Sequence, residues 1–256
     1  MSAIQKLHDV CKASFSLLGA VPSPPAIQTV RNALDNIECA DVGLDWKEAQ
    51  QDDDGFGYYG LVKGCRGRLS AMVPRWAQPI TYLHLYEKEN FFSMGIFCLP
   101  TSAAIPLHNH PGMTVFSRLL YGSMHVRSYD WVNPFSELSG DASTPRLAKL
   151  VADHVLTAPC ESAVLFPASG GNIHAFTALT PCAVLDVLTP PYSPIDARHC
   201  IYYRESKFCG YPHDSTESEQ ELDLQEPIYV WLEESQPSSD DFVIQEGFYK
   251  GPKIKP

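Results

Sequence analysis

From residue 80 onward, the chain breaks into short runs rich in β-branched and aromatic residues, separated by Gly, Pro, Asn and Asp. Many short strands with turn residues between them, and no clear helical segment among them, are typical of antiparallel sandwiches and barrels. We therefore expect a mainly β protein and, in particular, a double-sheet jelly roll. The predicted strands cover residues 81–87, 91–99, 114–122, 123–131, 162–166, 174–179, 182–189 and 200–204.

Helices are expected only before this β-rich part. Ser23 can cap a helix that begins with Pro24 and Pro25, two residues that suit a first turn. Apolar residues then recur at helical spacing, namely Ile27, Val30, Leu34 and Ile37. A preceding helix is expected over residues 3–18.

We expect one domain over residues 1–256. It would comprise a helical N-terminal part to about residue 75, a β-barrel core over 76–205, and a C-terminal extension over 206–256 that packs on the barrel. Residues 50–60, 213–223 and 235–241 are polar and acidic segments that indicate exposed loops.

The charge balance argues against several classes of protein. With 30 Asp and Glu against 19 Lys and Arg, the chain offers no basic stripe for a phosphate backbone, so no direct nucleic-acid partner is expected. The eight cysteines are dispersed without a C-x-x-C pair, which disfavours a disulfide scaffold and structural zinc. No membrane span or secretion signal is recognisable, and we expect a monomer in cytoplasm and nucleus with reduced thiols.

The stretch PLHNHPGMTV, residues 106–115, places His108 and His110 two residues apart. On an extended strand such residues point to the same face, so the two imidazoles can chelate one metal if that face is the barrel interior. A third ligand would be His174, which a Pro- and Gly-rich turn delivers into an apolar strand. The alternative is two ordinary strand histidines and one satisfied core histidine.

Three long motifs carry a family resemblance: PLHNHPGMTVFSRLLYGSMHVRSYDW, FPASGGNIHAFTALTPCAVLDVLTPPY and RHCIYYR. Together they resemble the cupin thiol dioxygenases, a family related to cysteamine dioxygenase, and most closely the plant cysteine oxidases. The likeness extends from about Pro24 to the closing YKGPKI. It implies a cupin double-stranded β-helix in which the three histidines bind Fe(II), with Asp186 and Tyr192 near the iron in the substrate pocket.

The resemblance further implies the reaction and the partners. Dioxygen would convert the N-terminal cysteine of target proteins, among them transcription factors, to cysteine sulfinic acid, and this mark would lead to degradation when oxygen is plentiful. General cupins carry an acidic residue four or five positions after H-x-H, but Thr114 and Val115 stand there. A peptide substrate needs no arginine clamp, yet Arg75 and Arg118 remain candidate clamps, and free cysteine stays an alternative substrate.

A set of three neutral imidazoles leaves the full charge of Fe(II), which favours an anionic thiolate ligand. Val184 and Leu188 share a strand face with Asp186, which predicts a buried carboxylate that steers a substrate amine or a histidine rather than a solvated strand position. Tyr192 is either a donor to oxygen or sulfur, or a loop anchor.

Other interpretations stay open on the sequence. Cys200 and Tyr202 resemble a thioether-forming pair of animal relatives, although plain packing is expected. A three-histidine site also suits a zinc hydrolase or hydratase with a bound hydroxide. A cupin that binds a ligand without turnover is the third possibility.

Overall fold

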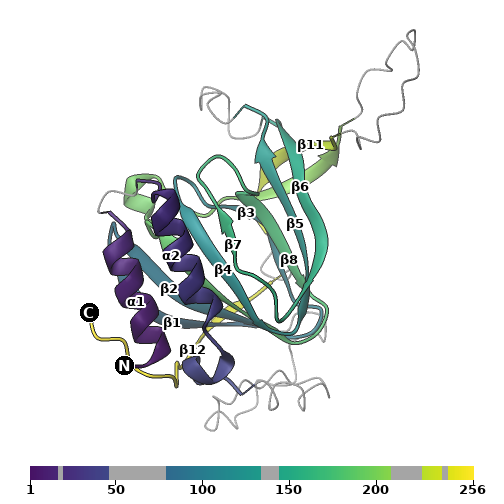
Figure 1. Ribbon diagram of the computed structural model, residues 1–256. Coiled ribbons are helices and arrows are strands. Elements are labelled where there is room, and N and C mark those ends of the chain that lie inside the picture. The colour runs from purple at the N-terminus through teal and green to yellow at the C-terminus, as the bar shows by residue number, and fades with distance from the viewer. Residues whose placement is uncertain (17–19, 46–78, 134–143, 209–226, 238–241) are drawn as a thin grey trace, which may run out of the picture.

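The computed structural model describes residues 1–16, 20–45, 79–133, 144–208, 227–237 and 242–256 (Figure 1). Two α-helices precede a body of antiparallel strands, and short 3-10 turns occur at Cys39–Val42 and Pro194–Asp196. The helices are α1 (Ala3–Ser14) and α2 (Pro24–Asp35). The strands are β1 (Ile80–Lys88), β2 (Phe92–Leu99), β3 (Ala104–Asn109), β4 (Thr114–Tyr121), β5 (Ser123–Trp131), β6 (Arg146–Thr157), β7 (Ala163–Leu165), β8 (Ile173–Ala178), β9 (Cys182–Thr189), β10 (Tyr202–Lys207), β11 (Tyr229–Ser235) and β12 (Ile244–Gly247).

The strands form two facing sheets of a cupin-type jelly roll (Figure 1). One sheet has the order β12-β1-β2-β9-β4-β7, and the other has the order β10-β11-β6-β5-β8-β3. In the second sheet β10 also pairs with β3 through Tyr202 and His108, so this sheet closes on itself. The predicted mainly β, cupin-type fold with short N-terminal helices is confirmed.

Each of the eight predicted strands has a counterpart, but β3, β6, β11 and β12 were not predicted as strands. Strand β6 is largely exposed, with only Ala148 of its residues buried, and its extended form depends on pairing with β5 and β11. In β3, Pro106 removes a backbone donor, and the register with β8 shifts between Ile105 and His108.

The two helices cover the outer face of the first sheet (Figure 1). Their apolar stripes, which include Leu7 on α1 and Leu34 on α2, join one core cluster with Phe92 of β2 and Leu185 of β9. The predicted second helix is confirmed, but the Ser23 side chain makes no capping hydrogen bond although Ser23 occupies the N-cap position. Helix α1 ends at Ser14 rather than residue 18.

Strand β9 is buried along its whole length, because helices cover one face and the jelly-roll interior covers the other. Side chains alternate between the two faces of a strand. Ala183, Leu185 and Val187 join the cluster beneath the helices. The alternate residues therefore face the interior, and this places Asp186 there.

The C-terminal part packs on the barrel. Strand β11 lies between β6 and β10, β12 runs parallel to β1, and Tyr249 and Ile254 pack against the helical core cluster near the N-terminus (Figure 1). Two predicted loops, 50–60 and 213–223, lie outside the described residues, and so does 238–241 of the predicted loop 235–241, whose first residue, Ser235, ends β11. Within the described ranges, no helix combines the length and apolar character needed to span a bilayer.

Candidate metal centre

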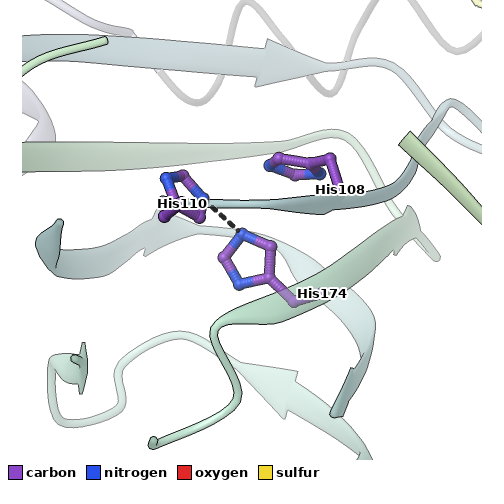
Figure 2. Close-up of side chains that lie close together, drawn as sticks. All are labelled: His108, His110 and His174. Atoms are coloured by element: carbon purple, nitrogen blue, oxygen red, sulfur yellow. Dashed lines mark hydrogen bonds between the residues drawn. The ribbon is translucent and has the colours of Figure 1, made fainter. Parts of the chain in front are cut away.

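His108, His110 and His174 come together although 64 residues separate the second from the third (Figure 2). His108 lies in β3 directly opposite His174 of β8, and His110 follows the end of β3. The ring centroids are 4.7–5.1 Å apart. The three rings offer nitrogen atoms that all lie within 4.8 Å of one another, and all three residues are buried.

The backbone around His110 is fixed by Asn172, which lies two residues before His174. The Asn172 side chain accepts a hydrogen bond from the His110 amide at 3.1 Å and donates one to the His110 carbonyl oxygen at 2.9 Å. Asp130 of β5 in turn accepts hydrogen bonds from the amides of Gly171 and Asn172. These contacts tie the loop before β8 to the end of β3, so the two histidine segments hold a fixed relation.

Hydrogen-bond partners indicate which ring nitrogens carry protons. Nδ1 of His108 lies 2.9 Å from the Pro106 carbonyl oxygen, so Nδ1 is the donor and Nε2 keeps its lone pair. The Tyr192 hydroxyl donates to the Asn109 carbonyl oxygen at 2.8 Å and lies 2.9 Å from Nδ1 of His110. The Tyr192 oxygen therefore accepts from Nδ1–H of His110, which leaves Nε2 of His110 as the free lone pair. Metal-binding histidines commonly use such an outer partner.

Burial keeps the three imidazoles neutral. It lowers the pKa of His108 to about 4, against hydrogen bonds with the backbone that raise it. Burial also holds the pKa values of His110 and His174 well below their usual range, and for these two residues neighbouring histidines add to the effect. A neutral imidazole is the form that binds a metal, so protons compete weakly at this site.

The ring spacing fits a metal ligand set. Nε2 of His110 lies 2.9 Å from Nε2 of His174, as the dashed line in Figure 2 shows. Two ligand nitrogens at about 2.1 Å from one ion and at right angles to each other are about 3.0 Å apart. Facing lone pairs at this distance repel unless a proton or a cation lies between them. The three residues could therefore hold a metal ion on one face of its coordination sphere.

The histidines open onto a cavity of about 330 Å³, which we call the histidine pocket. Its walls come from β1, β2, β3, β8, β9, the segment after β9, and the first residues of β10 and β12. Asp186 lines it together with Val184 and Leu188, the two residues expected to share its strand face. Ile244 of β12 also lines it, so the C-terminal extension contributes to the pocket.

Asp186 is a buried carboxylate, with 8% of the residue exposed. Burial raises its pKa to about 6, while a hydrogen bond with Ser117 on the adjacent strand β4 opposes that shift. Its Oδ1 atom is buried and has no hydrogen-bond partner among the residues that the structure describes. A buried carboxylate oxygen without a partner is costly, and it offers an acceptor to a ligand that carries N–H groups into the pocket.

Tyr192, Cys200 and Tyr202 line the same pocket. Both tyrosine hydroxyls hydrogen-bond to the Cys200 side chain, and burial raises the pKa of its thiol. Cys200 is a free cysteine.

Arg118 does not line the histidine pocket. Its guanidinium donates to Asp35 of α2 at 2.9 Å and to the Cys160 carbonyl oxygen at 3.1 Å, so it ties α2 to the first sheet. Arg75 lies outside the described residues. Among the parts of the chain that the structure describes, no second group of His, Cys, Asp and Glu with metal-binding geometry occurs.

Sequence reasoning missed the residues that hold the histidines in place. Asn172 and Asp130 were not singled out, and neither was Asn109, whose side chain accepts from the Ile201 amide at 2.9 Å and donates to the Tyr203 hydroxyl at 3.1 Å. The sequence carried one local signal for Asn172. It follows Gly-Gly and lies close to a predicted ligand, and in such a loop an Asn side chain commonly hydrogen-bonds to backbone groups.

The comparisons with known proteins agree with this geometry. A family model described as PCO_ADO matches residues 33–254. Plant cysteine oxidase 1 of Arabidopsis thaliana is 43% identical over 261 residues, covering 100% of this chain and 81% of that protein. Plant cysteine oxidase 2 of the same organism is 42% identical, covering 98% and 83%. The 2-aminoethanethiol dioxygenase of Mus musculus is 35% identical, covering 75% and 77%.

Proposed function

Because this chain belongs to the PCO_ADO family and is a thiol dioxygenase, we propose that it uses Fe(II) to oxidise the N-terminal cysteine of target proteins. The observation that supports this proposal is the meeting of His108, His110 and His174 at the wall of one pocket. These residues would be the iron ligands. When bound, a ferrous ion would supply open positions for a thiolate and dioxygen and would share electron density with the oxygen.

The three histidines would hold that ion without adding charge to it. Three uncharged imidazoles would leave the ion its full positive charge, and the apolar ring of Phe176 lies against His174 with centroids 4.4 Å apart. A cation in such surroundings favours an anionic ligand and lowers the pKa of a thiol that binds it. The substrate sulfur would therefore enter as a thiolate.

Asp186 would orient the substrate. An N-terminal cysteine carries an α-amine beside its side chain, and Oδ1 of Asp186 is a buried acceptor in the same pocket that no described residue engages. A hydrogen bond from the amine to this oxygen would hold the sulfur in one position. An N-terminal residue of a peptide has no free carboxylate, which agrees with the position of Arg118 outside the pocket.

Tyr192 would act mainly through His110. Its hydroxyl is engaged by the Asn109 carbonyl oxygen and by Nδ1 of His110, so it fixes the ring orientation and the tautomer of that histidine.

The overall reaction adds both atoms of one dioxygen molecule to the sulfur of the thiol. The S–H bond is lost, two S–O bonds form, and the proton leaves as the sulfinic acid ionises. Sulfur gives up four electrons and the two oxygen atoms accept them, so no external reductant is consumed. The product is cysteine sulfinic acid at the first residue.

The cellular role is part of the proposal. The substrates would be transcription factors with an exposed N-terminal cysteine, and their oxidation would feed an N-degron pathway, so that the enzyme senses oxygen. It would act as a monomer in cytoplasm and nucleus without binding nucleic acid or membranes directly.

Mass spectrometry tests the reaction. A peptide that begins with Cys is incubated with the iron-loaded enzyme in air and in nitrogen, beside the same peptide with an acetylated N-terminus and beside free cysteine. We expect a gain of two oxygen atoms on the first residue, only in air and only with the free amine. Metal analysis of protein purified without oxygen accompanies the assay. Zinc in the site with no oxygen consumption would refute the proposal.

A further inference from the structure

A second cavity, of about 180 Å³, reaches His174 from a different side of the jelly roll, and we call it the side chamber. It lies between β4 and β7 of the first sheet and β5, β6 and β8 of the second, strands that face one another in Figure 1. Apolar side chains form much of its wall, including Leu119 on β4 and Met124 and Val126 on β5. The exposed residues His154 and Glu161 mark its solvent side.

The side chamber and the histidine pocket share one wall. His174, Phe176 and Val184 line both cavities. The His174 and Phe176 rings lie side by side with centroids 4.4 Å apart. The two cavities open to solvent at different places, since Glu87 and Ile244 line only the histidine pocket, whereas His154 and Glu161 line only the side chamber.

The chemistry of the side chamber selects a small apolar molecule. An apolar cavity of roughly 150 Å³ stays dry and takes up xenon or benzene in other proteins, so a chamber of this size suits an apolar gas. The hydroxyl of Ser117, one of its polar wall groups, is hydrogen-bonded to Asp186. The chamber is too small for a folded segment of a protein substrate, and no charged side chain of its buried wall could recognise an amine.

Both reactants of a thiol dioxygenase must reach the same histidines. A peptide N-terminus seated in the histidine pocket fills the opening lined by Glu87 and Ile244 and closes that path to a second reactant. We propose that the side chamber is a dioxygen site and entry route, which delivers the gas past Val126 and Phe176 to His174 while the thiol occupies the other cavity. This inference rests on the proposed function.

Xenon binding and oxygen kinetics test the proposal together. Crystals of the protein are pressurised with xenon, and the same measurement is made on Val126→Phe, which fills the chamber near its inner end, and on Ala152→Phe, which fills it from the half-buried strand β6. Val155→Phe is the matched control, because Val155 is 53% exposed on β6 and does not line the chamber. Having two filling variants guards against one that fails to fold.

We expect xenon in the chamber of the wild type and of Val155→Phe, and none in the filled variants. In the filled variants kcat/KM for dioxygen should fall at least fivefold, while KM for a Cys-initiated peptide at saturating oxygen stays within twofold. A wild-type chamber without xenon, or filled variants with unchanged kcat/KM for dioxygen, would overturn the proposal while leaving the proposed function intact. If the wild type oxidises no thiol, the proposed function is overturned, and so is the role of the side chamber in delivering dioxygen. Xenon binding would then show only that the cavity exists.

Discussion

Replacing Asp186 by Asn should stabilise the metal-free protein and impair turnover. Asp186 is buried, its pKa is raised from 3.8 to about 6, and one carboxylate oxygen has no partner. Asn has nearly the same shape without the charge, and its oxygen can still accept from Ser117. The charge therefore costs folding free energy that the substitution removes, and a residue that is kept at such a cost is expected to serve the reaction.

The size of the effect follows from proton linkage. A group whose folded pKa lies above its unfolded value destabilises the folded state as pH rises through that interval. With values of 3.8 and about 6 for Asp186, the cost is about 1 kcal/mol at pH 4.5 and about 3 kcal/mol at pH 7.5. The stabilisation by Asp186→Asn should therefore be about 2 kcal/mol larger at pH 7.5 than at pH 4.5.

Urea unfolding of the metal-free proteins at both pH values measures this difference. Asp153→Asn is the control, since that carboxylate lies exposed on β6 in ion pairs with His125 and Arg127 and should change stability by less than ~1 kcal/mol. With iron, Asp186→Asn should lower kcat/KM for a Cys-initiated peptide about 10–100-fold, the value of one hydrogen bond to a charged group. If the stabilisation by Asp186→Asn is the same at both pH values, burial does not raise the pKa of Asp186 and the reasoning is refuted.

Three further predictions address the surroundings of the site. Tyr192→Phe should weaken metal binding by roughly tenfold in chelator competition, because His110 loses its outer partner, and should lower the thermal stability of the metal-free protein, because two buried groups lose a hydrogen bond. Ser117→Ala should move the acidic limb of the pH profile of kcat/KM to higher pH, since the Ser117 hydrogen bond lowers the pKa of Asp186. If the acidic limb does not move, Asp186 is not the group whose titration produces it. Gly171→Ala should lower the free energy of unfolding by at least ~2 kcal/mol, since Gly171 has φ +82° and a Cβ would collide with the Ser128 hydroxyl. Adding Ser128→Ala should restore only the part due to the collision with the hydroxyl, as measured by denaturant unfolding, because the Ser128 Cβ still lies 2.7 Å from the added Cβ.

Local sequence pattern was sufficient for most of the fold. Strand-forming residues separated by turn residues are governed by interactions within a few positions, so the predicted strands matched β1, β2, β4, β5 and β7–β10. Strand β6 was not predicted because its outer residues are polar or exposed, and because its extended form depends on pairing with strands on both sides. The helix over Pro24–Asp35 was predictable because its capping position, prolines and apolar spacing all agree locally.

The candidate site divides in the same way. The chain itself placed His108 and His110 at a spacing that puts them on one face of an extended segment. It could not state that His174 lies opposite His108, because that register depends on how β3 and β8 pair across the barrel. The clamp made by Asn172 and the bond from Tyr192 to His110 likewise join segments far apart in the sequence.

Asp186 shows which part of the site the sequence determines and which part depends on the tertiary structure. The sequence determined that Val184, Asp186 and Leu188 share one face of a strand, since side chains alternate with a period of two. Both faces of that strand are apolar, so the pattern alone could not say which face meets the histidines. Only the packing of α1 and α2 over the opposite face decided it, and with it the burial that raises the pKa of this carboxylate.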